Sequence, residues 1–433
     1  MDEQIIEPFT NPFTATMSPP GSKSLTNRAL VLAALGDGVS ELTNVLFADD
    51  TLVMLECLGK LGFSPEIDRQ TNTVRITGRA GKVPETAAEL FCGNSGTTIR
   101  FLTALCTLGK GTYNLDGIPR MRQRPIGPLV ELLHNLGARI EYAMSEGFAP
   151  VQVLADRLAG GLCRFGTSTS SQFLSAVLQA APYARHEVAV YLESPQTSWP
   201  YVAMTMRLMD QFGVTPELLR DPKTQEPTRI FIPQGHYAAT KYRVEPDASN
   251  ATYFLAAAAI HPGSTITING LGKHSLQGDV GFAHVLKRMG AEVSVGTDQI
   301  TVTGTDIFEG IDVNLGPMPD TAQTLAVAAL FAKEETTIRG LHTLRVKETD
   351  RIAALATELQ KLGAEVRIEG DDLTIFPPEK GPRPATIATY DDHRMAMSFA
   401  LAATKSAGVR IADPACVNKT YPGFFEDLER LRG

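Results

Sequence analysis

The sequence has few cysteines and none of the spacings that would tie them to a metal. Its five cysteines form no CxxC pair, and its eight histidines form no HExxH motif. These absences exclude a zinc ribbon, a HExxH metalloprotease and a dense disulfide framework. We therefore expect a reduced protein that needs no metal and no organic cofactor.

Long apolar runs and an excess of basic residues are also missing. No run approaches the about 18–20 apolar residues of a membrane span, and the N-terminal MDEQIIEPFT lacks the basic start of a signal peptide. The net charge of −8 argues against a general nucleic-acid surface. We expect a cytoplasmic protein with no membrane or nucleic-acid partner. Its 433 residues exceed the size of one core, so two or more domains are expected.

The stretch SPPGSKSLTNRAL, residues 18–30, looks like the end of a nucleotide-binding loop. That motif requires a glycine directly before the lysine and another five residues earlier. Ser22 and Met17 stand at those positions, so the motif does not predict ATP binding. An anion at this predicted helix start remains possible for other reasons.

Five segments share an apolar helical face followed by a glycine and a strand-like run. Their glycines recur every 73 to 77 residues, and a sixth stands at the end of the chain. The glycines are Gly62, Gly137, Gly213, Gly290, Gly363 and Gly433. A glycine after the last apolar turn is a usual left-handed helix stop.

A second series of helices with a buried character runs in step with the first. Small polar residues precede each one, as in GNSGTTIRFLTAL and STSSQFLSAVL. With the strand-like runs between helices, the predicted order is β-α-β-α-β-β, repeated six times. The last repeat lacks its closing strands, and we expect the N-terminal stretch QIIEPF to complete it. The predicted fold is α/β, with two domains of three repeats each: residues 1–21 with 242–433, and residues 22–241.

Basic residues stand in or near several predicted first turns, where the partial positive charge of a helix disfavours them. They are Lys23, Arg28, Arg100, Arg351 and Arg394. For any one of them, a surface ion pair such as Glu348 with Arg351 at i,i+3 is about as good an explanation. Because they recur in phase with the repeat, they indicate that helix starts together bind a multiply charged anion.

Eight motifs, in this order and spacing, resemble those of the 5-enolpyruvylshikimate-3-phosphate (EPSP) synthase family. They are PPGSKSLTNRAL, GNSGTTIRFL, RPIGPLVELL, SSQFL, PDTAQTLAVAAL, RVKETDR, YDDHRMAM and NKTYPGFF. The resemblance implies an inverse α/β barrel-like fold of two domains with three β-α-β-α-β-β repeats each, and an active site in the interdomain cleft. It also implies transfer of the enolpyruvyl group of phosphoenolpyruvate to the 5-hydroxyl of shikimate 3-phosphate, with release of phosphate, in the shikimate pathway.

The resemblance also implies binding residues. Those for shikimate 3-phosphate are Lys23, Ser24, Arg28, Ser170, Ser171, Gln172, Ser198, Tyr201, Asp320, Thr343 and Lys347. Those for phosphoenolpyruvate are Lys23, Gly96, Arg124, Gln172, Arg351, Arg394 and Lys419. The planar fork of arginine suits carboxylate and phosphate, and glycine at position 96 allows close approach to a helix start.

The reaction needs one base and one acid, and the resemblance implies Asp320 and Glu348. Asp320 would take the proton of the 5-hydroxyl, and Glu348 would protonate the methylene carbon of phosphoenolpyruvate, with Lys23 as a third catalytic residue. Glu348 must then keep its proton near neutral pH, whereas Lys347 beside it favours the charged form. Asp320 could also serve as a helix N-cap, which does not exclude catalysis. His393 either assists the chemistry or orients the neighbouring arginine.

There are two alternative functions, one an enzyme with another substrate and the other a protein without catalytic activity. UDP-N-acetylglucosamine enolpyruvyl transferase has the same fold and chemistry, but that family has a cysteine in the loop corresponding to DGIPRMRQRP, and this chain has none there. A non-catalytic anion-binding repeat protein would have no use for Asp320 together with Glu348. We expect a monomer that binds small-molecule substrates, and the resemblance implies inhibition by glyphosate.

Overall fold

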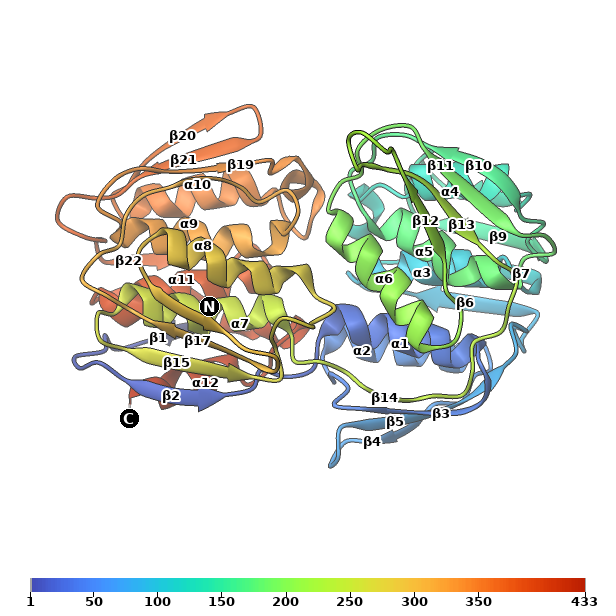
Figure 1. The fold of residues 1–433 in the computed structure, drawn as a ribbon, viewed down its shortest axis with the longest axis horizontal. Helices are drawn as coiled ribbons and strands as arrows, with labels where there is room; N and C mark the ends of the chain where they lie inside the picture. Colours follow the sequence, from blue (N-terminus) through green and yellow to red (C-terminus); the bar gives the residue numbers. More distant parts are fainter. Residues whose placement is uncertain (1, 433) are drawn as a thin grey trace. The chain divides into compact units, whose positions relative to one another are not determined.

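The computed structural model describes residues 2–432, and the chain forms two compact units (Figure 1). Unit 1 combines the N-terminal segment up to Pro20 with the segment from Glu245 onward, and unit 2 is Gly21–Val244. Compactness does not show whether each unit folds independently, so the division into two domains stays a prediction. Each unit is described by itself below.

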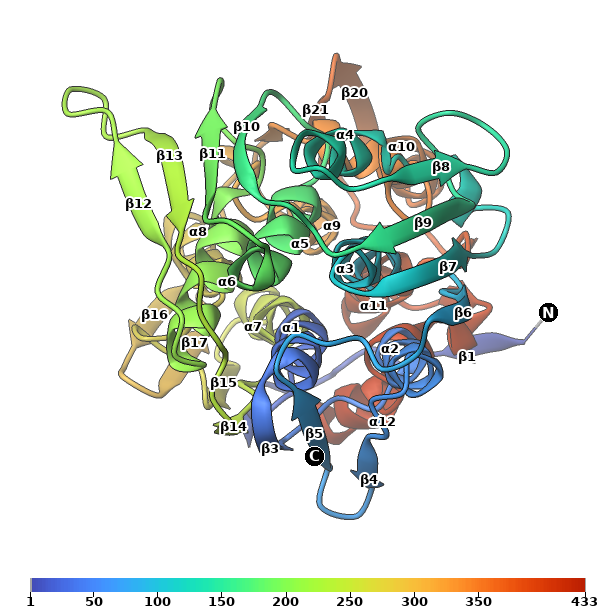
Figure 2. The same ribbon diagram turned by 90° about the vertical axis from the view of Figure 1, so that its right-hand side faces the viewer.

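Unit 2 contains three four-stranded sheets around three buried helices (Figure 2). In spatial order the sheets are β14 (Lys241–Arg243), β3 (Asp37–Thr43), β5 (Thr73–Arg79) and β4 (Glu66–Asp68); β6 (Ala87–Phe91), β7 (Lys110–Asp116), β9 (Val151–Asp156) and β8 (Ile140–Tyr142); and β10 (Gly161–Phe165), β11 (Val188–Leu192), β13 (Pro227–Ile232) and β12 (Glu217–Arg220). The buried helices are α1 (Lys23–Leu35), α3 (Gly96–Cys106) and α5 (Gln172–Ala180), and the second helices are α2 (Asp49–Lys60), α4 (Gly127–Asn135) and α6 (Trp199–Gln211).

Unit 1 repeats this plan with two four-stranded sheets and one three-stranded sheet. In spatial order they are β16 (Glu292–Val295), β17 (Gln299–Thr303), β15 (Thr265–Asn269) and β2 (Thr14–Met17); β18 (Asp312–Asn314), β19 (Thr336–Arg339), β21 (Asp372–Phe376) and β20 (Glu365–Glu369); and β1 (Glu3–Ile5), β23 (Val409–Ala412) and β22 (Ala385–Ile387). The buried helices are α7 (Ala248–Ile260), α9 (Ala322–Ala328) and α11 (His393–Lys405), and the second helices are α8 (Phe282–Arg288), α10 (Arg351–Lys361) and α12 (Phe424–Glu429).

The predicted β-α-β-α-β-β order is confirmed, most simply by β6-α3-β7-α4-β8-β9. In each four-stranded sheet one pair of strands is parallel and the other two pairs are antiparallel. In three of these sheets a buried helix connects the two parallel strands, because parallel strands need a long crossover between them: α3 connects β6 and β7, α5 connects β10 and β11, and α9 connects β18 and β19. The helix therefore lies on one face of its own sheet.

The N-terminal strands pair with strands from distant parts of the chain. β1 runs antiparallel to β23, with Glu3 opposite Ala412, in the sheet of the sixth repeat. β2 runs parallel to β15 and supplies the first strand of the fourth repeat. In unit 2, β14 has the same position next to β3. Each unit therefore closes through a strand that is far in sequence from its partner.

The recurring glycines stop the second helices as the sequence predicts. Gly62, Gly137, Gly213, Gly290 and Gly363 have φ between +86° and +114°, a left-handed conformation that glycine adopts without a Cβ penalty. Gly433, the sixth, lies outside the described residues. The predicted helix stops are thus confirmed for the five glycines that the structure describes.

The central helices are buried on all sides, because each packs against its sheet and against other helices. Every residue of α3 and of α7 is buried. A helix buried in this way shows no polar face, which is why its sequence reads as apolar and small throughout. Among residues 2–432, no helix has both the length and the apolar character needed to cross a bilayer.

Gly111 in β7 offers a test of how closely the chain before β6 approaches β7 within one sheet. Its φ is +146°, and an added Cβ would overlap the carbonyl oxygen of Thr86. Gly161, at the start of β10, has φ +104° but open space around its Cβ position, so it isolates the backbone strain. We expect Gly161→Ala to lower the free energy of unfolding by ~1–2 kcal/mol and Gly111→Ala by ~1–3 kcal/mol more. Urea unfolding measures both, and equal losses would show that the overlap relaxes without cost.

Candidate functional site

In unit 2, the residues predicted from the sequence gather at the starts of the three buried helices. α1 begins at Lys23, α3 begins at Gly96, and α5 begins at Gln172, directly after Ser170 and Ser171. The first N–H groups of a helix have no partner within the helix and carry partial positive charge. Each start therefore favours a bound anion.

Side-chain hydrogen bonds show that these helix starts lie next to one another. Arg100 of α3 donates from Nη1 to Oε1 of Gln172 in α5, at 2.5 Å. Arg28 of α1 donates from Nη2 to Oγ of Ser175 in α5, at 3.3 Å. The N-terminal ends of α1, α3 and α5 thus form one region within unit 2.

Arg28 is a buried cation whose hydrogen-bond acceptors are uncharged. Its Nε donates to Oγ1 of Thr205 at 2.7 Å, and its Nη1 donates to the carbonyl oxygen of Ser24 at 3.0 Å. The guanidinium also lies 5.1 Å from the ring centre of Phe101. Burial lowers the pKa of Arg28 to about 10, so it is positively charged at neutral pH. Its charge is available to an anionic ligand.

Arg124 and Arg100 lie close to Gly96 at the start of α3. Arg124 donates from Nη1 to the carbonyl oxygen and to Oδ1 of Asn94, at 3.0 and 3.2 Å. A Cβ at position 96 would lie 2.7 Å from Nη2 of Arg124 and 2.8 Å from Nη1 of Arg100. The sequence predicted close approach to this glycine, and the structure shows that two guanidinium groups approach it.

Lys23 forms an ion pair that sequence reasoning missed. Its Nζ lies 3.3 Å from Oδ2 of Asp50 in α2, and both side chains are largely buried. Asp50 stands in the run FADD, where it reads as an ordinary acidic residue of a helix first turn. The pair fixes the lysine side chain at the start of α1.

The remaining predicted residues of unit 2 contribute hydroxyl and backbone groups. Ser170 accepts a hydrogen bond at Oγ from the backbone N–H of Gln172, at 3.2 Å. Ser198 precedes α6 in a left-handed conformation with φ +51° and is buried. The carbonyl oxygen of Tyr201 accepts from Nη2 of Arg28 at 3.4 Å. The first turn of α6 is thereby attached to the arginine of α1.

In unit 1, Arg351 is surrounded by three carboxylates. Its Nε donates to Oδ2 of Asp392 at 2.7 Å, and its Nη2 donates to Oε2 of Glu348 at 2.9 Å. Its Nη1 donates to Oδ1 of Asp320 at 3.3 Å. Burial alone would lower the pKa of Arg351, but the three carboxylates outweigh it and raise that pKa above its ordinary value. This guanidinium therefore holds both the predicted base and the predicted acid.

Asp320 lies in the 3-10 turn η4 (Pro319–Thr321), directly before α9. Its Oδ2 accepts from Nη2 of Arg394 at 2.9 Å, and Nζ of Lys347 lies 3.8 Å from its Oδ1. The alternative interpretation of Asp320 as an N-cap is wrong, since Met318 and Thr321 occupy the N-cap positions of η4 and α9. The carboxylate of Asp320 contacts the cations Arg351, Arg394 and Lys347.

Glu348 pairs with Arg351 at i,i+3, but the pair is not a surface feature. Only 7% of the Glu348 side chain and 1% of the Arg351 side chain are exposed. Lys347, which the sequence suggested as the cation next to Glu348, lies near Asp320.

Three other residues of unit 1 were singled out from the sequence. Thr343 is buried in η6 (His342–Val346), and its hydroxyl finds no hydrogen-bond partner among residues 2–432. Lys419 is buried at the end of η7 (Pro414–Lys419). His393 begins α11, with Nδ1 3.6 Å from Oδ1 of Asp392. Thr343 and His393 are near in sequence to Glu348 and Asp392 of the Arg351 cluster.

Asp279 is a buried carboxyl group that the sequence did not reveal. It lies in η3 (Gly278–Gly281) and accepts a hydrogen bond from the hydroxyl of Ser249 in α7. Burial, together with the charge of Asp320, raises the pKa of Asp279 from 3.8 to about 6. The only available signal was the short run QGDVG, which reads as a turn.

The predicted site residues therefore fall into two groups, one in each unit. Unit 2 supplies cations, helix starts and hydroxyl groups, and unit 1 supplies carboxylates held by arginines. Among the described residues, no group of three or more His, Cys, Asp or Glu side chains is arranged to hold a metal ion.

Comparisons with known proteins give one consistent result. The family model for EPSP synthase (3-phosphoshikimate 1-carboxyvinyltransferase) matches residues 9–428. The 3-phosphoshikimate 1-carboxyvinyltransferase of Sulfurovum sp. is 46% identical over 415 residues, which is 95% of each chain. The enzyme of the same name from Trichormus variabilis is 42% identical over the full length of both chains. The solved structure of EPSP synthase from Acinetobacter baumannii matches with a TM-score of 0.82 and 26% identity, covering 99% of this chain and 97% of that one.

Asp279 makes the stability of unit 1 depend on pH. Its folded-state pKa of about 6 exceeds the ordinary value of 3.8, so its contribution to the free energy of unfolding is complete below about pH 4 and is lost as the pH rises through about 6. A shift of this size corresponds to roughly 3 kcal/mol. Asp279→Asn should therefore gain that much relative to the wild type between about pH 4 and pH 7, measured by urea unfolding. The exposed Asp306→Asn serves as control, and parallel pH profiles for wild type and Asp279→Asn would contradict the assignment.

Proposed function

The chain belongs to the EPSP synthase family, and on that premise we propose how its residues carry out the reaction. The reaction transfers the enolpyruvyl group of phosphoenolpyruvate to the 5-hydroxyl of shikimate 3-phosphate and releases phosphate, as a step of the shikimate pathway. Both substrates carry phosphate and carboxylate groups. The assignment of individual residues below is our proposal.

Unit 2 supplies most of the positive charge for the two substrates. Arg28 and Arg124 are buried and donate to uncharged oxygens, so an anionic ligand would gain charge-assisted hydrogen bonds. The proposed contacts with shikimate 3-phosphate in this unit are Lys23, Ser24, Arg28, Ser170, Ser171, Gln172, Ser198 and Tyr201. Those with phosphoenolpyruvate are Lys23, Gly96, Arg124 and Gln172.

Unit 1 supplies the acid–base groups and further cations. Its proposed contacts with shikimate 3-phosphate are Asp320, Thr343 and Lys347, and those with phosphoenolpyruvate are Arg351, Arg394 and Lys419. The unpartnered hydroxyl of buried Thr343 supports a ligand contact there, because a buried polar group without a partner is costly.

The observation that carries the mechanism is the double contact of Arg351 with Asp320 and Glu348. In the addition step, Asp320 takes the proton of the 5-hydroxyl, and the hydroxyl oxygen forms a bond to C2 of phosphoenolpyruvate. Glu348 gives its proton to C3, so the carbon–carbon double bond becomes a single bond. A shared guanidinium fixes the distance between base and acid, which favours proton transfer at two positions of one substrate complex.

The elimination step reverses the proton transfer at carbon. Glu348 takes a proton back from C3, the double bond forms again, and the bond between C2 and the phosphate oxygen breaks. Inorganic phosphate leaves with the proton that Asp320 took from the 5-hydroxyl, so both carboxyl groups return to their starting protonation states. Lys23, held by Asp50 at 3.3 Å, is placed to stabilise negative charge as it develops.

Cellular location and oligomeric state also belong to the proposal. We propose a cytoplasmic monomer, supported by two units that each contain three sheets with their own buried helices. Size-exclusion chromatography with light scattering would test the second part.

The reaction itself is tested by phosphate release with each substrate separately and with both together. We expect release only with phosphoenolpyruvate and shikimate 3-phosphate present. The runner-up, UDP-N-acetylglucosamine enolpyruvyl transfer, predicts release when the sugar nucleotide replaces shikimate 3-phosphate. The absence of a cysteine between Asp116 and Pro125 favours the first result.

Glu348→Gln and Asp320→Asn should fold normally and lose at least ~10²-fold in kcat, because each removes one proton-transfer group. The shapes of both side chains are retained, so KM should change less than kcat. Glu369→Gln and Asp298→Asn, two exposed carboxylates of the same unit, serve as matched controls. Wild-type turnover in either site variant would remove that residue from the mechanism.

A further inference from the structure

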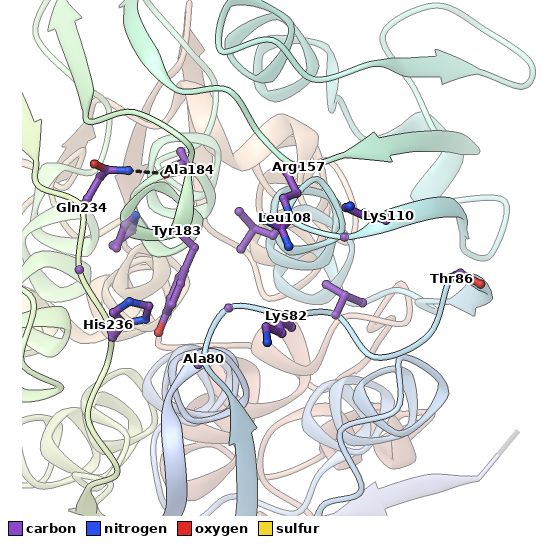
Figure 3. Close-up of a pocket in the computed structure, with 15 residues that line it drawn as sticks. Ala80, Lys82, Thr86, Leu108, Lys110, Arg157, Tyr183, Ala184, Gln234 and His236 are labelled. Carbon is purple, nitrogen blue, oxygen red and sulfur yellow. Dashed lines mark hydrogen bonds between the residues drawn. The ribbon is translucent and has the colours of Figure 1, made fainter.

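A cavity of about 490 Å³ lies within unit 2, away from the helix starts (Figure 3). All three repeats of the unit line it, with Lys82 from the first, Leu108, Lys110 and Arg157 from the second, and Tyr183 and His236 from the third. Figure 3 shows Tyr183 and His236 on one side of the cavity and Arg157, Leu108 and Lys110 on the other. None of the lining residues is an aspartate or a glutamate.

The cations of this cavity are not neutralised by the protein. Among residues 2–432, Lys82, Lys110 and Arg157 form no ion pair, although exposed arginines elsewhere in the unit do, such as Arg139 with Glu141. Asp156 lies opposite Lys110 in the β7–β9 register, but it pairs with Arg185 at 3.5 Å. Three exposed cations without an ion pair among the described residues thus line one cavity, in a chain with a net charge of −8.

The ends of the buried helices could explain cations here, because a helix C-terminus carries about half an elementary negative charge. The last carbonyl groups are already occupied, however. The backbone N–H of Gly81 donates to the carbonyl of Leu35 at the end of α1, and that of Gly109 donates to Cys106 at the end of α3. The partial charge of each end is also smaller than the full charge of one cation, so positive charge remains.

The cavity is also rigid and partly apolar. The hydroxyl of Tyr183 accepts from the backbone N–H of Tyr237 at 2.9 Å, and its ring packs edge-on against His236 at 5.4 Å. The backbone of Gly81 lies against the same ring, since a Cβ there would overlap it. Leu108 is buried beside these groups. A rigid, partly apolar surface with convergent charges loses little entropy when a ligand binds.

We propose that this cavity is a second anion-binding site, which takes a small molecule bearing two or more negative charges as phosphate or carboxylate groups. It is separate from the proposed active site, because the two lie at opposite ends of α1, α3 and α5. The thirteen residues of α1 span about 20 Å at ~1.5 Å per residue. A ligand there would contact all three repeats of unit 2.

The proposal is tested with pyrophosphate and with citrate as probes, using the full chain and isothermal titration calorimetry near physiological ionic strength. The triple variant Lys82→Ala, Lys110→Ala, Arg157→Ala removes the three cations, and Lys60→Ala, Arg139→Ala, Lys223→Ala removes three exposed cations of the same unit as a charge-matched control. We expect wild type and control to bind one more equivalent of probe than the triple variant. The rate of enolpyruvyl transfer without probe should be the same in all three.

The single variant Arg157→Ala keeps the test valid if the triple variant does not fold, and we expect it to bind the probe at least about tenfold more weakly. Binding of pyrophosphate alone would identify a polyphosphate ligand, binding of citrate alone a polycarboxylate, and binding of both would support the shared requirement for charge. Equal stoichiometry in wild type and triple variant, or an unchanged affinity in Arg157→Ala, would overturn the proposal. Failure of phosphate release in the activity assay would not affect these outcomes.

Discussion

Three helices buried along most of their length can pack together in unit 2 only if their polar ends are satisfied at the surfaces where they emerge. α1, α3 and α5 run parallel, so their N–H ends collect in one region and their carbonyl ends in another. Peptide dipoles that point the same way add to one another. The proposed substrate contacts of this unit follow from that arrangement, and the cation-lined cavity lies at the opposite ends of the same helices.

The two units differ in which groups surround their buried arginines. In unit 2, Arg28 and Arg124 rest on hydroxyl and carbonyl oxygens, so their full positive charge remains for a ligand. In unit 1, three carboxylates surround Arg351, so its charge is already paired within the protein. One unit thus presents positive charge that can attract anions, whereas the other holds the carboxyl groups that are proposed to exchange protons.

The repeat, the helix stops and the family could be predicted because each of them depends on residues that are close together in the sequence. Gly62 and its equivalents follow an apolar helical face, and each motif occupies one short run of the chain. The contacts of Asp392 and Asp279 could not be predicted, because their partners Arg351 and Ser249 are 41 and 30 residues away. Asp320 illustrates the same limit: its position before a helix suggested a cap, and only the tertiary structure shows that Arg351 of the same repeat and Arg394 of the next repeat bind it.

The pairing of the N-terminal strands has a consequence for the nascent chain on the ribosome. All strand partners of unit 2 lie between β3 and β14, so its sheets can form once residue 243 has emerged. β1, in contrast, must wait for β23, which is made some 400 residues later, or roughly 20–80 s at ~5–20 residues per second. During translation its edge stays unpaired. The charged and polar residues Asp2, Glu3 and Gln4 make pairing of this strand with other chains unfavourable before β23 has been made.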